Sequence, residues 1–210
     1  MTPREILRRH LDECPLIAII RGVSPDDSEA TADAIFEGGI RIVEVPLNSP
    51  DPLRSIERIA AKLGDRLLVG AGTVLRAEQV DEVRNAGGGI IVSPDTNTDV
   101  IAAAAAAGLV SCPGYFTPSE AFAALRAGAH GLKLFPAEGA SPSVLKGQLA
   151  VIPKEVPVLA VGGISPDNMQ PWLAAGASGF GLGSGLYKPG QSAADTLANA
   201  RAYVAGVKRQ

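Results

Sequence analysis

An alternation of two kinds of segment, repeated eight times, constrains the fold of this chain more than any other feature. Short runs rich in Val, Ile and Leu are followed by longer, alanine-rich amphipathic stretches, and each unit takes about 20–25 residues. The short runs predict strands at 15–21, 41–47, 67–73, 89–94, 109–114, 131–136, 157–163 and 179–184. The stretches between them predict helices at 25–37, 50–63, 77–86, 98–107, 118–127, 142–152, 166–175 and 193–207.

Strands that alternate with helices pair in parallel, and eight such units favour closure into a barrel. The alternative is a doubly wound open sheet, but its usual GxGxxG motif is absent after the first strand, where residues 21–24 read Arg-Gly-Val-Ser. We therefore predict an α/β fold, a (β/α)₈ TIM barrel, formed by a single domain over residues 1–210. Residues 3–12 predict an extra N-terminal helix that covers the N-terminal end of the barrel.

Several helix starts are marked by a serine or threonine followed by proline. Such a cap accepts a hydrogen bond from a free N–H of the first turn, and proline fits the first helical position because its missing N–H is not needed there. The predicted caps are Ser24, Ser49, Thr117, Ser141 and Ser165.

The composition excludes several classes of partner. A net charge of −3 and an aromatic content of 4% provide neither a basic patch nor stacking surface for a nucleic acid. No apolar run is long enough to span a bilayer, and the charged first residues do not resemble a signal peptide. Cys14 and Cys112 are far apart, so a disulfide framework is not expected. We expect a cytoplasmic protein with neither a nucleic-acid nor a membrane partner.

Polar residues fall at the C-terminal ends of most predicted strands, where barrels of this kind carry out their chemistry. Lys133 stands out because it interrupts an apolar strand, with Leu132 and Leu134 on the opposite face. If Lys133 faces the barrel axis, burial disfavours its ammonium form and favours the neutral amine that attacks a ketone. The alternative is a structural lysine held in an ion pair. The other lysines fall on helices or loops, where solvation is the better interpretation.

Glu44 is the second candidate for chemistry. Alternation along its strand places Ile42, Glu44 and Pro46 on one face. A carboxylate inside a barrel is costly unless it is paired or catalytic. Glu44 could form a salt bridge to Lys133 or Arg21, or it could move protons with a pKa that burial raises toward neutrality, and the two roles are compatible.

Glycines after the last two predicted strands form a candidate phosphate site. Gly162-Gly163 and Gly183-Ser184 would allow backbone N–H groups to approach phosphate oxygens, and Ser184 would add a hydroxyl donor. The alternative is that these glycines only form tight turns.

No metal or cofactor is expected. His10 and His130 are predicted away from the catalytic end, and no His, Cys, Asp or Glu residues cluster at ligand spacing. Cys112 is expected to be a small core residue, because no histidine is placed to activate it. Trp172 and Tyr187 are expected to serve packing.

Several motifs, in the same order along the chain, resemble the KDPG/KHG aldolase family of class I aldolases. They are GAGTVL at 70–75, CPG at 112–114, KLFP at 133–136 and VGGISPDN at 161–168. The resemblance covers about residues 15–187 and implies a (β/α)₈ barrel that assembles as a homotrimer. It implies that Lys133 forms a Schiff base and that Glu44 is the general acid/base. The other implied positions are Thr73 for the pyruvyl carboxylate, Pro94 and Phe135 for the walls of the pyruvate pocket, and Arg21, Gly162, Gly163, Gly183 and Ser184 for substrate and phosphate.

Two departures resemble the members of the family that act on the galactonate epimer of the substrate. Residues 44–50 read EVPLNSP, so Asn48 stands where the gluconate-specific members carry an arginine, and Arg21 is left to hold more of the substrate carboxylate. Val161 stands where those members carry a threonine. The change removes a hydroxyl that would face the C4 hydroxyl of the substrate, so it can alter stereochemical preference.

The resemblance therefore implies a carbon–carbon lyase that splits a small phosphorylated sugar acid, 2-dehydro-3-deoxy-6-phospho-D-galactonate, into pyruvate and D-glyceraldehyde 3-phosphate without a cofactor. One alternative is the same reaction on the gluconate epimer or on 4-hydroxy-2-oxoglutarate. Another is a different phosphate-binding barrel enzyme, such as an epimerase or a synthase, that uses Glu44 as a base and Lys133 only as a charge. The last is a non-catalytic barrel that binds sugar phosphates.

Overall fold

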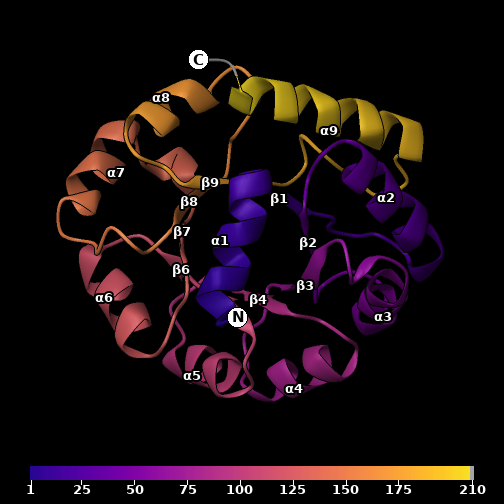
Figure 1. The fold of residues 1–210 in the computed structure, drawn as a ribbon, viewed down its shortest axis with the longest axis horizontal. Coiled ribbons are helices and arrows are strands. Elements are labelled where there is room, and N and C mark those ends of the chain that lie inside the picture. The colour runs from indigo at the N-terminus through magenta and orange to yellow at the C-terminus, as the bar shows by residue number, and fades with distance from the viewer. Residues whose placement is uncertain (209–210) are drawn as a thin grey trace.

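The computed structural model describes residues 1–208, and within them nine parallel strands form one sheet (Figure 1). The strands are β1 Leu16–Ile19, β2 Ile42–Pro46, β3 Leu68–Gly72, β4 Ile90–Val92, β5 Val110–Cys112, β6 Gly114–Tyr115, β7 Leu132–Leu134, β8 Val158–Val161 and β9 Gly179–Leu182. Their spatial order is β5-β4-β3-β2-β1-β9-β8-β7-β6. The edge strands β5 and β6 are separated only by Pro113, so they are two parts of one predicted strand. The sheet closes on itself, and the predicted (β/α)₈ barrel is confirmed.

Eight helices of the described residues surround this barrel, and α1 crosses one end of it (Figure 1). The helices are α1 Pro3–Glu13, α2 Pro25–Glu37, α3 Pro52–Leu63, α4 Glu78–Asn85, α5 Thr98–Ala106, α6 Pro118–Arg126, α7 Pro142–Leu149, α8 Met169–Ala174 and α9 Ala193–Lys208. All of the predicted helices are present, including the extra one at the N-terminus. Residues 209–210 of the predicted domain lie outside the described residues.

Three of the predicted helix caps are confirmed and two are wrong. Ser24, Thr117 and Ser141 each accept a hydrogen bond from an N–H of the first turn. The other two serines do not cap helices. Ser49 instead accepts a hydrogen bond from the N–H of Gly22, 2.9 Å away, and α3 begins two residues later than that cap predicts.

The start of α8 is also later than predicted, because a side chain holds the preceding loop. Asn168 accepts a hydrogen bond from the N–H of Ser165 at 2.9 Å and donates one to the carbonyl oxygen of Gly163 at 2.7 Å. These bonds give the backbone partners that a helical turn would otherwise supply. The chain therefore stays irregular until Met169.

Alternation along the strands divides the apolar residues into two layers. The outer layer fills the space between the strands and the helices and includes Val43 and Val45 of β2. The inner layer fills the barrel and includes Ile42 of the same strand. Leu7 and Leu11 of α1 belong to this inner layer, so α1 closes the N-terminal end of the barrel with apolar side chains. The opposite, C-terminal end is left for polar residues.

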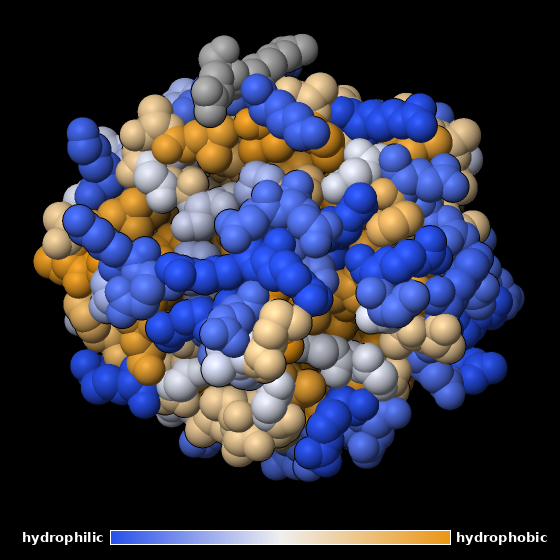
Figure 2. Space-filling view, in the orientation of Figure 1, coloured by the Kyte–Doolittle hydropathy of each residue, from blue (hydrophilic) through white to orange (hydrophobic). Residues whose placement is uncertain are grey.

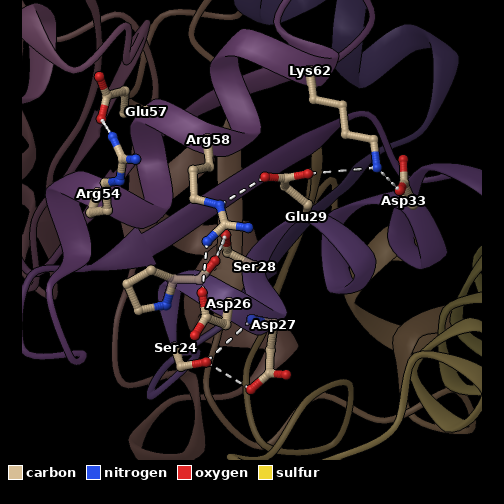
Figure 3. Close-up of polar contacts among 11 residues, drawn as sticks. Ser24, Asp26, Asp27, Ser28, Glu29, Asp33, Arg54, Glu57, Arg58 and Lys62 are labelled. Carbon is tan, nitrogen blue, oxygen red and sulfur yellow. Dashed lines mark hydrogen bonds and ion pairs between the residues drawn. The ribbon is translucent and has the colours of Figure 1, made fainter.

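Ion pairs on the outer surface join α2 and α3. Arg58 of α3 bonds to Glu29 and Asp26 of α2 at 2.7 and 2.8 Å, and Lys62 bonds to Asp33 at 2.5 Å (Figure 3). The face that carries α1 is largely hydrophilic over that helix (Figure 2). No helix in the described part of the chain has the length and apolar character that crossing a membrane requires.

Candidate active site

Lys133 points into the barrel, as the sequence predicts. Its neighbours Leu132 and Leu134 are fully buried in the outer layer, so the alternation of β7 turns the lysine inward. The side chain is 8% exposed, and its Nζ lies 4.6 Å from the centre of the Phe135 ring. Burial lowers the pKa of Lys133, an effect that the nearby charge of Glu44 opposes and that of Arg21 reinforces. A larger share of this amine is therefore neutral than is usual for lysine.

Glu44 faces the same interior from β2. It is 2% exposed, and its Oε2 is buried without a hydrogen-bond partner. Burial raises the pKa of Glu44 from 4.5 to about 7, although Lys133 and Arg21 favour the charged form. Within residues 1–208 no ion pair of 4.0 Å or less joins Glu44 to either cation, so the salt bridge considered from the sequence does not form. The carboxyl group can both give and take a proton near neutral pH.

Gly72, at the end of β3, makes room for this carboxyl group. β3 pairs with β2, and a Cβ built on Gly72 would lie 1.7 Å from Oε2 of Glu44 and 2.3 Å from its Cδ. No side chain can occupy that position while Glu44 keeps its rotamer. The second glycine of the GAGT motif is thus explained by the space that Glu44 needs.

We expect Gly72→Ala to lower kcat by about 10- to 100-fold, because the new methyl group would overlap the carboxyl group of Glu44 and displace it from its present position. The helical Gly147→Ala is the matched control, since nothing lies within 4 Å of its added Cβ. Steady-state kinetics of both variants, with circular dichroism to check folding, tests this. Equal activity in the two folded variants would show that the position of Glu44 is not set by Gly72.

A cavity of about 420 Å³ opens at the C-terminal ends of the strands and brings the two groups together. This volume suits a small ligand. Most of the residues predicted from the sequence line it: Arg21, Glu44, Thr73, Pro94, Lys133, Phe135, Val161, Gly162, Gly163, Gly183 and Ser184. Since they come from seven different strands or the loops after them, the closed barrel is what gathers them.

Asn48 is the predicted substrate residue that does not line the cavity. Its side chain is exposed, and its Oδ1 accepts a hydrogen bond from Nη1 of Arg21. Nη2 of Arg21 donates to Oγ1 of Thr73 at 3.4 Å. Asn48 and Thr73 therefore orient the guanidinium that lines the cavity, and the direct contact expected for Asn48 becomes an indirect one.

The two glycine pairs occupy the loops after β8 and β9. Gly162 and Gly163 have φ values of +114° and +65°, which a residue with a side chain rarely adopts. A Cβ on Gly163 would also lie 2.5 Å from Cγ of Glu138, so these glycines give that side chain its place. The tight-turn interpretation is thus supported for this pair, and a phosphate role for it stays a prediction.

Sequence reasoning missed three residues with polar side chains that line the cavity, namely Glu138, Tyr187 and Lys188. Tyr187 is 3% exposed, so it packs as expected, but it also borders the cavity. Lys188 is exposed as expected and reaches the cavity from its loop. The available signal was position, because all three lie within six residues of the end of a strand.

The two histidines and Cys112 do not line this cavity. Nδ1 of His10 lies 2.8 Å from the carbonyl oxygen of Ile6 in α1, and His130 accepts a hydrogen bond from the N–H of Ser111. Cys112 is fully buried in the inner layer, where burial raises the pKa of its thiol to about 12. Among the described residues, no three His, Cys, Asp or Glu side chains are grouped as metal ligands would be.

Fold and cavity together define a (β/α)₈-barrel protein with a buried lysine and a buried carboxyl group at the C-terminal mouth. The family model for KDPG and KHG aldolase matches residues 7–200 of this chain. The chain belongs to that family.

Individual relatives cover nearly all of the chain. A 2-dehydro-3-deoxy-6-phosphogalactonate aldolase of Escherichia coli (strain K12) is 46% identical over 90% of this chain and 93% of its own length. A probable 2-dehydro-3-deoxy-6-phosphogalactonate aldolase of Rhizobium meliloti (strain 1021) is 48% identical over 92% of this chain and 91% of its own. A solved structure described as native KDPGal has a TM-score of 0.91 and 45% identity, over 92% of this chain and 94% of that one.

Proposed function

We propose that this protein is a class I aldolase that cleaves 2-dehydro-3-deoxy-6-phospho-D-galactonate into pyruvate and D-glyceraldehyde 3-phosphate. The observation that carries the proposal is that Lys133 and Glu44 are both buried and line the same cavity. Burial lowers the pKa of the Lys133 amine and raises the pKa of the Glu44 carboxyl group. The names of two relatives that match nearly the whole chain support this substrate.

The reaction begins with attack of the neutral Lys133 amine on the C2 ketone, which forms a carbinolamine. Glu44 protonates the departing hydroxyl group, and water leaves to give a protonated imine. A carboxyl group with a pKa of about 7 suits this step, because it is partly protonated at neutral pH and can take the proton back later.

The protonated imine then accepts electrons. The C4 hydroxyl loses its proton to a base, the C3–C4 bond breaks, and its electron pair moves into the imine to form an enamine as the aldehyde departs. The enamine is protonated at C3 and water hydrolyses the resulting imine, which releases pyruvate and regenerates the Lys133 amine.

Binding roles follow from position around the cavity. Arg21, oriented by Asn48 and Thr73, would bind the pyruvyl carboxylate together with the Thr73 hydroxyl. Pro94 and Phe135 would form walls of the pyruvate pocket. Backbone N–H groups of the loops that contain Gly162-Gly163 and Gly183-Ser184 would bind the phosphate.

Val161 is the residue that we propose to separate the epimers. It lies at the end of β8, in the inner layer, and lines the cavity with an apolar side chain. A valine offers no hydrogen bond to the C4 hydroxyl, whereas a threonine would favour one orientation of that group.

We therefore expect a higher kcat/KM for the galactonate epimer than for the gluconate epimer in a coupled pyruvate assay. Val161→Thr is expected to narrow the preference by roughly tenfold, because it adds one hydrogen bond for the other epimer. Val158→Thr, in the outer layer of the same strand, is the control for adding a buried hydroxyl. A wild-type preference for the gluconate epimer would contradict the assignment of the substrate.

The family resemblance also supports a homotrimer, one domain over residues 1–210 and a cytoplasmic location without a cofactor. Sedimentation equilibrium should give three times the mass of the chain. A monomer at micromolar concentration would contradict the trimer without affecting the chemistry proposed for Lys133.

A further inference from the structure

The loop after β9 carries a cation, Lys188, for which the reaction steps above have no role. The carbonyl oxygen of Gly183 accepts hydrogen bonds from the N–H groups of Leu186 and Tyr187 at 2.9 and 3.1 Å, which folds the loop back over the end of the strand. Leu186 and Tyr187 are buried and anchor this turn. Lys188 follows them directly, is exposed to solvent and lines the cavity.

Contacts on both sides hold this loop in place. Gly22, in the loop after β1, has a φ of +80°, and a Cβ on it would lie 2.6 Å from Cγ of Pro189. On the other side, the side chains of Gln191 and Asn199 donate hydrogen bonds to the carbonyl oxygen of Leu186 at 2.8 and 3.1 Å. The backbone of Lys188 is therefore positioned by the fold, and its side chain extends from a fixed point.

The ammonium group of Lys188 has no partner within the described residues. No ion pair or side-chain hydrogen bond involves it, in contrast to Lys62, which pairs with Asp33 on the outer surface. Arg21, the other permanent cation of the cavity, is already bound by Asn48 and Thr73 on the side of β1 to β3. Lys188 is thus an unpaired positive charge in the loop after β9, the strand next to β1, and it lines the cavity together with Gly183 and Ser184.

The remaining charge at the mouth has the opposite sign. Glu138 follows β7, packs over Gly163 and lines the cavity with a carboxyl group. A carboxylate repels a phosphate dianion, so of the two glycine loops that would bind that group, the loop after β8, near Glu138, contributes less than the loop after β9. The side near Gly183 and Lys188 combines backbone N–H groups with an ammonium group, which is the combination that binds phosphate well.

We propose that Lys188 binds the phosphate group of the substrate and is the residue that makes the protein prefer a phosphorylated sugar acid to its unphosphorylated form. The proposal rests on the proposed aldolase function and adds a specificity residue to it. Because the phosphate lies at the far end of the substrate from C2, Lys188 contributes binding and takes no part in the chemistry at Lys133.

The test compares kcat/KM for 2-dehydro-3-deoxy-6-phosphogalactonate and for unphosphorylated 2-dehydro-3-deoxygalactonate. Lys188→Gln is expected to lower the value for the phosphorylated substrate by about 10- to 100-fold, mainly through KM, because a charged hydrogen bond is lost. The value for the unphosphorylated substrate should stay within about twofold, since it carries no group for Lys188 to bind. Lys188→Arg should keep most of the preference, and Lys146→Gln, on the exposed face of α7, should keep all of it.

Two results would overturn the proposal: an equal loss with both substrates, which indicates a structural role, or no change with either. A wild-type protein that cleaves neither substrate would instead contradict the proposed function. In that case calorimetric binding of inorganic phosphate decides the role of Lys188 separately. Weaker binding in Lys188→Gln supports it, and unchanged binding rules it out.

Discussion

Lys133→Ala is expected to lower kcat for aldol cleavage by at least about 10⁴-fold, because the amine is the group that we propose to bond to the substrate. Within the described residues, one other lysine lines the cavity, Lys188. It is exposed and lies in the loop after β9. A substitute nucleophile is therefore missing. The coupled pyruvate assay, run at high protein concentration, measures the residual rate.

Loss of activity must be separated from loss of the fold. Removing a desolvated amine should not destabilise the barrel, and far-ultraviolet circular dichroism should be unchanged. Lys146→Ala on α7 is the matched control, because its side chain is exposed and away from the cavity; it should retain full activity. Turnover that survives in Lys133→Ala would favour an enzyme that uses Lys133 only as a charge, as in the epimerase or synthase alternative.

Glu44→Gln should have the second-largest effect, a fall in kcat of about 10²- to 10⁴-fold, because the amide cannot transfer protons. The variant is nearly isosteric, so the space that Gly72 leaves stays filled. The same change at Glu37, an exposed residue at the end of α2, is the control. Activity within a few fold of wild type would show that water or another group moves the protons.

The same variant gives a prediction about stability, with a definite sign. In the folded protein burial raises the pKa of Glu44 from 4.5 to about 7, so folding favours the protonated form. Well below pH 4.5 the group is neutral in both states and costs nothing. As the pH rises above 4.5, Glu44 ionises in the unfolded state before it ionises in the native state. Ionisation stabilises the unfolded state, so above pH 7 the free energy of unfolding is lower by about 3 kcal/mol.

At pH 8 Glu44→Gln should therefore unfold at a higher urea concentration than wild type. Its free energy of unfolding should be higher by up to about 3 kcal/mol. The difference should fall to about 1 kcal/mol near pH 5 and approach zero well below pH 4.5. A variant less stable than wild type at pH 8 would indicate that the carboxylate is stabilised by a partner, contrary to its unpartnered Oε2.

Much of the fold could be predicted because local pattern and tertiary structure agree. The inward Lys133 and Glu44 followed from period-two alternation, and parallel strands bring their C-terminal ends together. The predicted helix starts were wrong where the sequence offers more than one residue that could begin the helix. Residues 49–52 read Ser-Pro-Asp-Pro, and the contact of Ser49 with Gly22, remote in sequence, decides that the helix begins at Pro52.

The site was predictable at strand ends and less so in loops. Thr73 directly follows β3 and Val161 ends β8, so position in the sequence was enough to find them. Glu138 and Lys188 lie in loops whose conformations depend on contacts remote in sequence. Glu138 packs against Gly163, and the loop of Lys188 packs through Pro189 against Gly22. Their position shortly after a strand end was a signal, but the local sequence of these loops does not show which way the side chains point.

The central claim is that the buried amine of Lys133 forms a covalent imine with a ketone. The most direct measurement is to incubate the protein with pyruvate, reduce with borohydride and locate the adduct by peptide mass spectrometry. We predict one reduced pyruvyl group per chain, on the peptide that contains Lys133, and none in Lys133→Ala. An active protein that gives no adduct, or gives one on a different lysine, would contradict this account.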